Sequence, residues 1–142
     1  MTGSYSLDKQ PTATDINIVS KGLDDFNSMI VEPDNHEPMN IVVKDDQGNV
    51  IGGILGGTYW KWLHIERFWI AEAYRGQGLG KKLLGEMEKE AVEKGCRNVH
   101  VETHDFQALR FYLKNGYKRK MRLKDLPEGH SKYFLVKRLS VR

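Results

Sequence analysis

Arg75-Gly76-Gln77-Gly78-Leu79-Gly80 is a glycine-rich turn that follows a predicted strand and begins a predicted helix. The first amide groups of a helix lack partners inside the helix and carry partial positive charge. Glycines at this point leave the backbone uncovered, so phosphate oxygens can reach those N–H groups. Arg75 and the following Lys81 add full positive charges beside the turn. The segment therefore predicts a pyrophosphate-binding site.

Two other phosphate-binding loops fit the segment poorly. A P-loop needs a glycine, four residues and then Gly-Lys-Ser/Thr, whereas here Lys81 is followed by Lys82 and position 75 is arginine. A dinucleotide-binding fold expects G-x-G-x-x-G near the start of a parallel βαβ unit, whereas this chain has G-x-G-x-G after a predicted meander. A tight turn that binds nothing is the remaining structural alternative.

Three predicted strands precede the turn, at residues 40–44, 50–59 and 63–70. The first two are joined by Asp-Asp-Gln-Gly-Asn at residues 45–49, which is rich in residues that tolerate left-handed backbone conformations. Four glycines in the second strand indicate a bulge or a close backbone contact. We expect the three strands to form an antiparallel meander.

The rest of the chain predicts an α/β (α+β) fold. At the N-terminus we expect a flexible tail over residues 1–12, a short strand at 16–19 and an amphipathic helix at 20–31. After the turn, apolar spacing predicts a helix from Leu79 to about residue 94, ended by Gly95. We expect a single domain over residues 1–142. Its last elements are a strand at 98–103, a helix capped by Asp105 and ending at Lys114, and strands at 117–123 and 132–139.

Two segments resemble signatures of the GNAT superfamily of N-acetyltransferases. Residues 75–80 match R/Q-x-x-G-x-G/A, and residues 105–117, Asp-Phe-Gln-Ala-Leu-Arg-Phe-Tyr-Leu-Lys-Asn-Gly-Tyr, are similar to N-x-x-A-x-x-F-Y-x-x-x-G-F/Y. The resemblance extends over about residues 40–139, and residues 127–135 resemble a small bacterial subgroup of the superfamily. It implies a mixed, mostly antiparallel central sheet flanked by helices.

The resemblance also implies acetyl-CoA as co-substrate and direct transfer to an acceptor amine, without a covalent enzyme intermediate. The acceptor is a primary amine of a small molecule or peptide, and its identity is left open, as is a homodimer. Asp105 replaces the asparagine of the second signature and cannot donate an amide N–H. The cofactor-binding residues implied are Phe68, Trp69, Ile70, Arg75, Gly76, Gln77, Gly78, Leu79, Gly80, Lys81, Asp105 and Lys114.

Three side chains are the leading candidates for proton transfer, and His100 and His104 are lesser candidates for the base. The resemblance makes Tyr112 the general acid, since a phenol with a pKa of about 10 can protonate a departing thiolate. Glu66, or else His64, is the candidate base that accepts a proton from the acceptor amine through a water molecule. Because strand side chains alternate, we expect both to share one face with Phe68 and Ile70.

The composition of the chain argues against several other classes of protein. A net charge of +3 is too small to indicate nucleic acid, although basic residues gather over residues 118–138 as a solvated surface or a landing zone for an anion. No apolar run approaches the roughly 20 residues of a membrane span. The single Cys96 cannot form an internal disulfide, which favours the cytoplasm.

Further binding functions are left as alternatives. No His, Cys, Asp or Glu cluster has convincing metal-ligand spacing, so no metal is predicted. A noncatalytic acyl-CoA sensor would keep the pyrophosphate turn without turnover. A small RNA-binding module is less consistent with the glycine-rich turn and with the lack of an aromatic RNA-binding strand.

Overall fold

The computed structural model describes residues 3–139 and divides into two units, with the boundary in the sequence between Pro33 and Asp34. In the first unit, α1 (Ala13–Ser28) begins at a capping box in which Thr12 and Asp15 each accept a hydrogen bond from the other's backbone N–H. The predicted strand at 16–19 is therefore wrong, because this cap starts the helix earlier than the apolar spacing indicated. The helix predicted at 20–31 ends at Ser28. The single-domain organisation stays a prediction.

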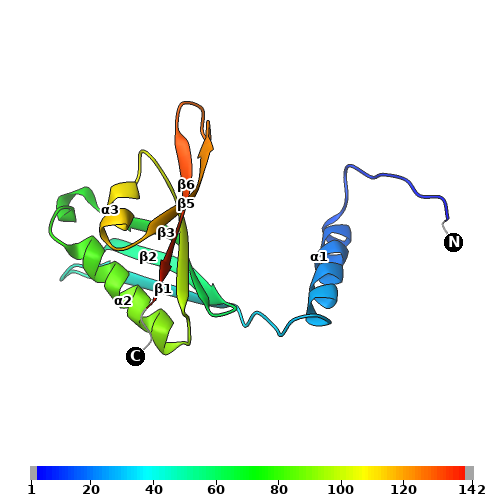
Figure 1. Ribbon diagram of the computed structural model, residues 1–142, viewed down its shortest axis with the longest axis horizontal. Helices are drawn as coiled ribbons and strands as arrows, with labels where there is room; N and C mark the ends of the chain where they lie inside the picture. Colours follow the sequence, from blue (N-terminus) through cyan, green and yellow to red (C-terminus); the bar gives the residue numbers. More distant parts are fainter. Residues whose placement is uncertain (1–2, 140–142) are drawn as a thin grey trace. The chain divides into compact units, whose positions relative to one another are not determined.

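The second unit contains a six-stranded sheet in the order β1-β2-β3-β4-β6-β5 (Figure 1). All neighbours are antiparallel except β3 and β4. The predicted meander and the mixed α/β fold are confirmed. The strands are β1 (Glu37–Lys44), β2 (Val50–Tyr59), β3 (Trp62–Ile70), β4 (Asn98–His104), β5 (Lys118–Lys124) and β6 (Ser131–Arg138).

The core of this unit lies between the sheet and α2 (Leu79–Glu93), which runs across the strands in Figure 1. The apolar face of α2 is buried with strand residues such as Leu63 and Ile65. Each such side chain contributes about 1.5–3 kcal/mol when fully buried. This packing fixes the start of α2 relative to the end of β3, with the short helix η1 (Glu72–Tyr74) between them. The buried residues of α2 are Leu83, Leu84, Met87 and Ala91.

The helix after β4 is shorter than predicted. α3 spans Leu109–Lys114, and its N-cap is Ala108, so the prediction that Asp105 caps it is wrong. The Asp105 carboxylate is engaged elsewhere: it accepts a hydrogen bond from the Ser131 N–H at 2.9 Å and lies 2.8 Å from His130 Nδ1. Asp105 therefore ties the end of β4 to the start of β6.

A bulge interrupts the pairing of β2 with β3. Leu55 lies opposite Arg67 and Gly56 opposite Ile65, which leaves Glu66 as the extra residue. A Cβ atom on Gly56 would overlap the backbone oxygen of His64, so the bulge and the close backbone contact expected from the glycines are both confirmed.

The bulge also overturns the expected alternation along β3. Leu63 and Ile65 belong to the buried core before it, and Phe68 and Ile70 pack on that core after it. His64 therefore points away from the face that Phe68 and Ile70 share, and the expectation of one common face is wrong. The reason is the extra residue, which shifts the two-residue period by one.

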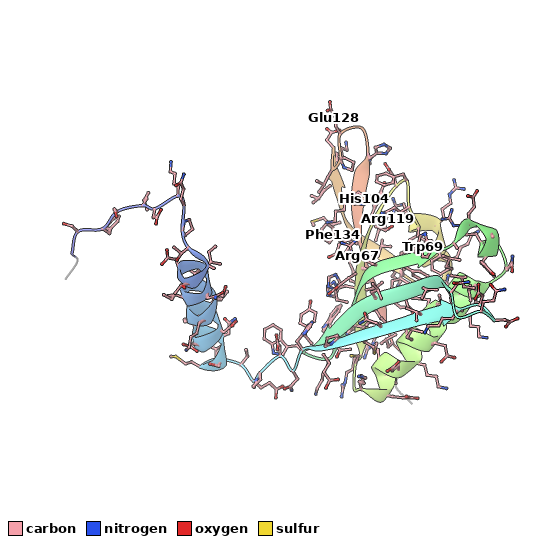
Figure 2. All side chains as sticks on the ribbon, turned by 180° about the vertical axis from the view of Figure 1, so that it is seen from behind. Arg67, Trp69, His104, Arg119, Glu128 and Phe134 are labelled. Carbon is pink, nitrogen blue, oxygen red and sulfur yellow. The ribbon has the colours of Figure 1, made fainter. Side chains whose placement is uncertain are left out.

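β5 forms one edge of the sheet, and all seven of its residues are exposed. Five of the seven are lysine or arginine. With β6 it forms a hairpin whose loop carries Glu128, labelled at the tip in Figure 2. Among residues 3–139, no helix has the length and apolar character required to cross a membrane.

Candidate active site

One opening lies where β3 and β4 separate. They pair only between Trp62–Ile65 and Asn98–Val101, so the second half of β3 has a partner strand on the β2 side alone. A cavity of about 320 Å³ occupies this gap. Figure 2 shows Arg67 and Trp69 on this part of β3. The lining of the cavity includes Glu66, Phe68, Glu102, Thr103 and Tyr112.

A larger cavity of about 860 Å³ borders the first and reaches the glycine-rich turn. It brings together most of the predicted cofactor-binding residues, from β3, the turn and α3. Gln77 and Leu79 are absent from its lining, and so is Asp105, because its carboxylate is engaged with β6. The predicted residues that line it are Phe68, Trp69, Ile70, Arg75, Gly76, Gly78, Gly80, Lys81 and Lys114.

The start of α2 has the form of an anion-binding site. Gly76 and Gly78 have φ angles of 73° and 81°, which a side chain would strain. A Cβ atom on either would meet no atom within 4 Å, so the backbone there faces open space. In the described part of the chain, no side chain caps the first turn of α2. The Arg75 side chain donates from Nε to the Ile70 carbonyl at 2.8 Å and fixes the turn. These residues fit the diphosphate of acetyl-CoA.

Tyr112 lies on α3 and lines the smaller cavity, although only 3% of the residue is exposed. Its ring contacts Phe68 and Tyr117, at centroid distances of 6.4 and 5.3 Å. Within residues 3–139 its hydroxyl has no hydrogen-bond partner. Burial raises the pKa of Tyr112 well above the usual value for a phenol, so the hydroxyl keeps its proton at neutral pH.

Glu66 and His64 differ in the cavities that they line. Glu66, at the bulge, lines the cavity that contains Tyr112 and also a third cavity of about 210 Å³ on the other side of β3. His64 lines only the third cavity, together with Asp34, His36 and Tyr59. The structure thus brings Glu66, but not His64, to the same cavity as Tyr112.

The catalytic and cofactor-binding residues predicted from the sequence did not include Glu102 or Tyr59. Glu102 Oε2 lies 2.8 Å from His64 Nε2, and Tyr59 Oη lies 2.7 Å from His100 Nε2. The rings of His64 and His100 stack at a centroid distance of 4.2 Å. The spacing of His100 and Glu102, two residues apart in a strand, was a usable signal, since it places both on one face. The pairing of β4 with β3 was not visible in the sequence.

The remaining candidates lie outside these cavities. Cys96 is 1% exposed in the core, and burial raises the pKa of its thiol, which disfavours the nucleophilic thiolate. The late basic residues lie on β5 and β6, and none lines any of the three cavities.

Comparison with known proteins identifies relatives of this chain. The model of the "Acetyltransferase (GNAT) family" matches residues 12–117. Blasticidin-S acetyltransferase of Streptomyces morookaense is 40% identical over 66% of this chain and 70% of that protein. The crystal structure of an acetyltransferase from Bacillus cereus is 34% identical, covers 94% of this chain and 98% of its own, and has a TM-score of 0.90.

A more distant solved structure shares the fold. It is a Bacillus anthracis protein in complex with acetyl coenzyme A, 20% identical over 81% of this chain and 68% of that one, with a TM-score of 0.65. The family match spans most of the chain and includes both the glycine-rich turn and α3. The chain belongs to the acetyltransferase (GNAT) family.

Proposed function

We propose that the protein transfers the acetyl group of acetyl-CoA directly to a primary amine of a small molecule or peptide. One observation carries the proposal: the gap between β3 and β4 joins the glycine-rich start of α2 to a cavity lined by both Glu66 and Tyr112. An uncovered helix start suits a diphosphate, and a carboxylate with a phenol suits proton transfer at the reacting atoms.

Acetyl-CoA, when bound, supplies an acetyl thioester. The amides at Gly78 and the first turn of α2 hold its diphosphate, with Arg75 and Lys81 beside them. The unpaired edge of β3 at Phe68, Trp69 and Ile70 offers backbone groups to the pantetheine amides, as to an added strand.

Two side chains move the protons. Glu66 accepts a proton from the acceptor amine through a water molecule, because its carboxylate borders both the Tyr112 cavity and the third cavity. Tyr112 donates its proton to the departing thiolate, because its side chain lines the same cavity as Glu66. His64 assists by accepting protons on the far side of Glu66, since its Nδ1 lies 3.9 Å from Glu66 Oε1.

The acceptor is the least defined part of the proposal. The relative named for blasticidin S favours a small-molecule acceptor, so that compound belongs in an amine panel with polyamines, aminoglycosides, amino acids and peptide N-termini. Release of free thiol from acetyl-CoA, dependent on both enzyme and amine, supports the proposal. Tight acetyl-CoA binding with no thiol release from any amine favours the noncatalytic sensor.

Replacing Glu66 with glutamine is expected to lower kcat/KM by about 10²-fold or more at neutral pH, because the acceptor amine then lacks a proton acceptor. The loss becomes smaller as the pH approaches the amine pKa of about 10, because much of the amine in solution is then already unprotonated. A pH series of thiol release measures both effects. Glu86→Gln, an equal change on the exposed surface of α2, is the control. A Glu66→Gln loss that is equal at every pH contradicts the base role.

Replacing Gly78 with leucine is expected to weaken acetyl-CoA binding by about tenfold or more, because the new side chain covers the amides that receive the diphosphate. Gly48→Leu is a matched control, since Gly48 has a φ of 84° and equally open surroundings in the β1–β2 turn. Each variant should lose about 1–2 kcal/mol of stability from backbone strain. Calorimetric titration measures the acetyl-CoA affinity of each variant. Equal affinities in the two variants would show that the diphosphate does not bind at this turn.

A further inference from the structure

Two histidines and a glutamate gather on the face of the sheet away from the core. His64 on β3 and His100 on β4 are direct partners in the parallel register, and Glu102 lies two residues beyond His100 on the same face. All three are partly exposed, so the cluster is open to solvent ions. One nitrogen or oxygen atom from each side chain lies within 4.8 Å of the other two.

The spacing of these atoms is close to that around a metal ion. Ligands about 2.0–2.2 Å from a tetrahedral zinc ion lie about 3.3 Å from one another. His64 Nε2 and Glu102 Oε2 are 2.8 Å apart, and the two imidazole rings stack with an interplanar angle of 9°. The in-plane lone pairs of the two stacked rings lie in separate planes, so both imidazoles must turn about their Cβ–Cγ bonds before the three donors face one centre.

The chemistry of the donors points the same way. Two imidazole nitrogens and one carboxylate oxygen, with one position open for water, are a donor set that zinc uses. Burial, and then the neighbouring His64, lower the pKa of His100, which favours the neutral ring that binds metals. Tyr59 Oη lies 2.7 Å from His100 Nε2, beside the cluster.

We propose that His64, His100 and Glu102 bind one divalent transition-metal ion of the Zn²⁺ type, and that the bound ion inhibits acetyl transfer. Coordination occupies a lone pair of His64 and places positive charge in the wall of the third cavity, which His64 and Glu66 both line. The same charge repels a protonated amine from the third cavity. The inhibition rests on the proposed function, whereas the binding does not.

The binding is tested on tag-free protein treated with a chelator, by competition for Zn²⁺ against a chromophoric chelator and by the visible spectrum of added Co²⁺. We expect one ion per chain and intense Co²⁺ absorption bands, as tetrahedral sites give. His100→Gln and Glu102→Gln should each weaken Zn²⁺ binding by about tenfold or more, since loss of even an outer-shell partner costs 10–100-fold. Far-ultraviolet circular dichroism verifies that both variants fold.

His104→Gln is the matched control, because it removes a histidine of the same strand that is outside the cluster. It should bind Zn²⁺ as the wild type does. Wild-type affinity in both His100→Gln and Glu102→Gln, or an equal loss in His104→Gln, overturns the site.

The inhibition is tested by adding Zn²⁺ to the thiol-release assay. Wild-type activity should fall in proportion to site occupancy and return when the ion is chelated, while His100→Gln should need about tenfold more Zn²⁺ for the same loss. Full activity of the saturated wild type overturns the inhibitory role. If no amine is ever acetylated, the proposed function fails, and the chelator competition still decides whether the ion binds.

Discussion

Replacing Tyr112 with phenylalanine will slow acetyl transfer by about 10²- to 10⁴-fold, the usual contribution of a positioned general acid. The substitution removes only the hydroxyl, which has no hydrogen-bond partner among residues 3–139 and belongs to a side chain that lines the same cavity as Glu66. The packing of the ring against Phe68 and Tyr117 is kept, so acetyl-CoA affinity should stay near the wild-type value. Steady-state thiol release gives the rate, and calorimetric titration gives the affinity.

Tyr117→Phe is the matched control for this prediction. Tyr117 is also buried and in contact with Tyr112, but its hydroxyl donates to Glu88 at 2.7 Å, away from the cavities. Its loss should lower the stability by about 1–3 kcal/mol and leave the rate per folded molecule unchanged. Because burial raises the pKa of Tyr112, an alkaline decline of the wild-type rate near neutral pH must come from another group. Equal rates for Tyr112→Phe and the wild type would end the acid assignment.

Replacing Gly56 with alanine is expected to destabilise the protein by about 3 kcal/mol, near the upper end of the usual cost of overpacking. The added Cβ would overlap the backbone oxygen of His64, and neither strand can give way without losing sheet hydrogen bonds. The strand that must shift carries Glu66 at the bulge, so the remaining folded protein should also lose activity. Chemical denaturation measures the stability, and thiol release per folded molecule measures the second effect.

Gly85→Ala is the control, and its expected sign is opposite. Gly85 lies within α2, where a Cβ atom would meet nothing within 4 Å, and alanine is the better helix former by about 1 kcal/mol. This variant should unfold at higher denaturant concentration than the wild type. A Gly56→Ala protein as stable as the wild type would mean that the two strands are not held in close contact at the bulge.

The order of elements from β1 to β6 could be predicted because local signals agree there. The turn at residues 45–49 is fixed by the Asp45 carboxylate, which accepts hydrogen bonds from the N–H groups of Gln47 and Asn49. Gly95 ends α2 with a φ of 91°, as a glycine in that position permits. In both cases the residues that set the geometry are neighbours in the sequence.

The errors occur where distant contacts decide. Asp105 is a good helix cap by residue type, yet Ser131 and His130 use its carboxylate instead. The face that Glu66 occupies depends on a bulge, which the glycines of β2 indicated without giving its position. The grouping of His64 with His100 depends on two strands coming together from separate parts of the chain. None of these contacts leaves a periodic pattern in the residues themselves.

The exposed edge strand β5 has a consequence for how the molecule behaves at high concentration. An unpaired row of backbone groups can recruit the same row from another molecule and extend the sheet without limit. Here Lys118, Arg119, Lys120, Arg122 and Lys124 project from that row. Two such strands brought together would set like charges side by side, and this repulsion guards the protein against fibrous aggregation.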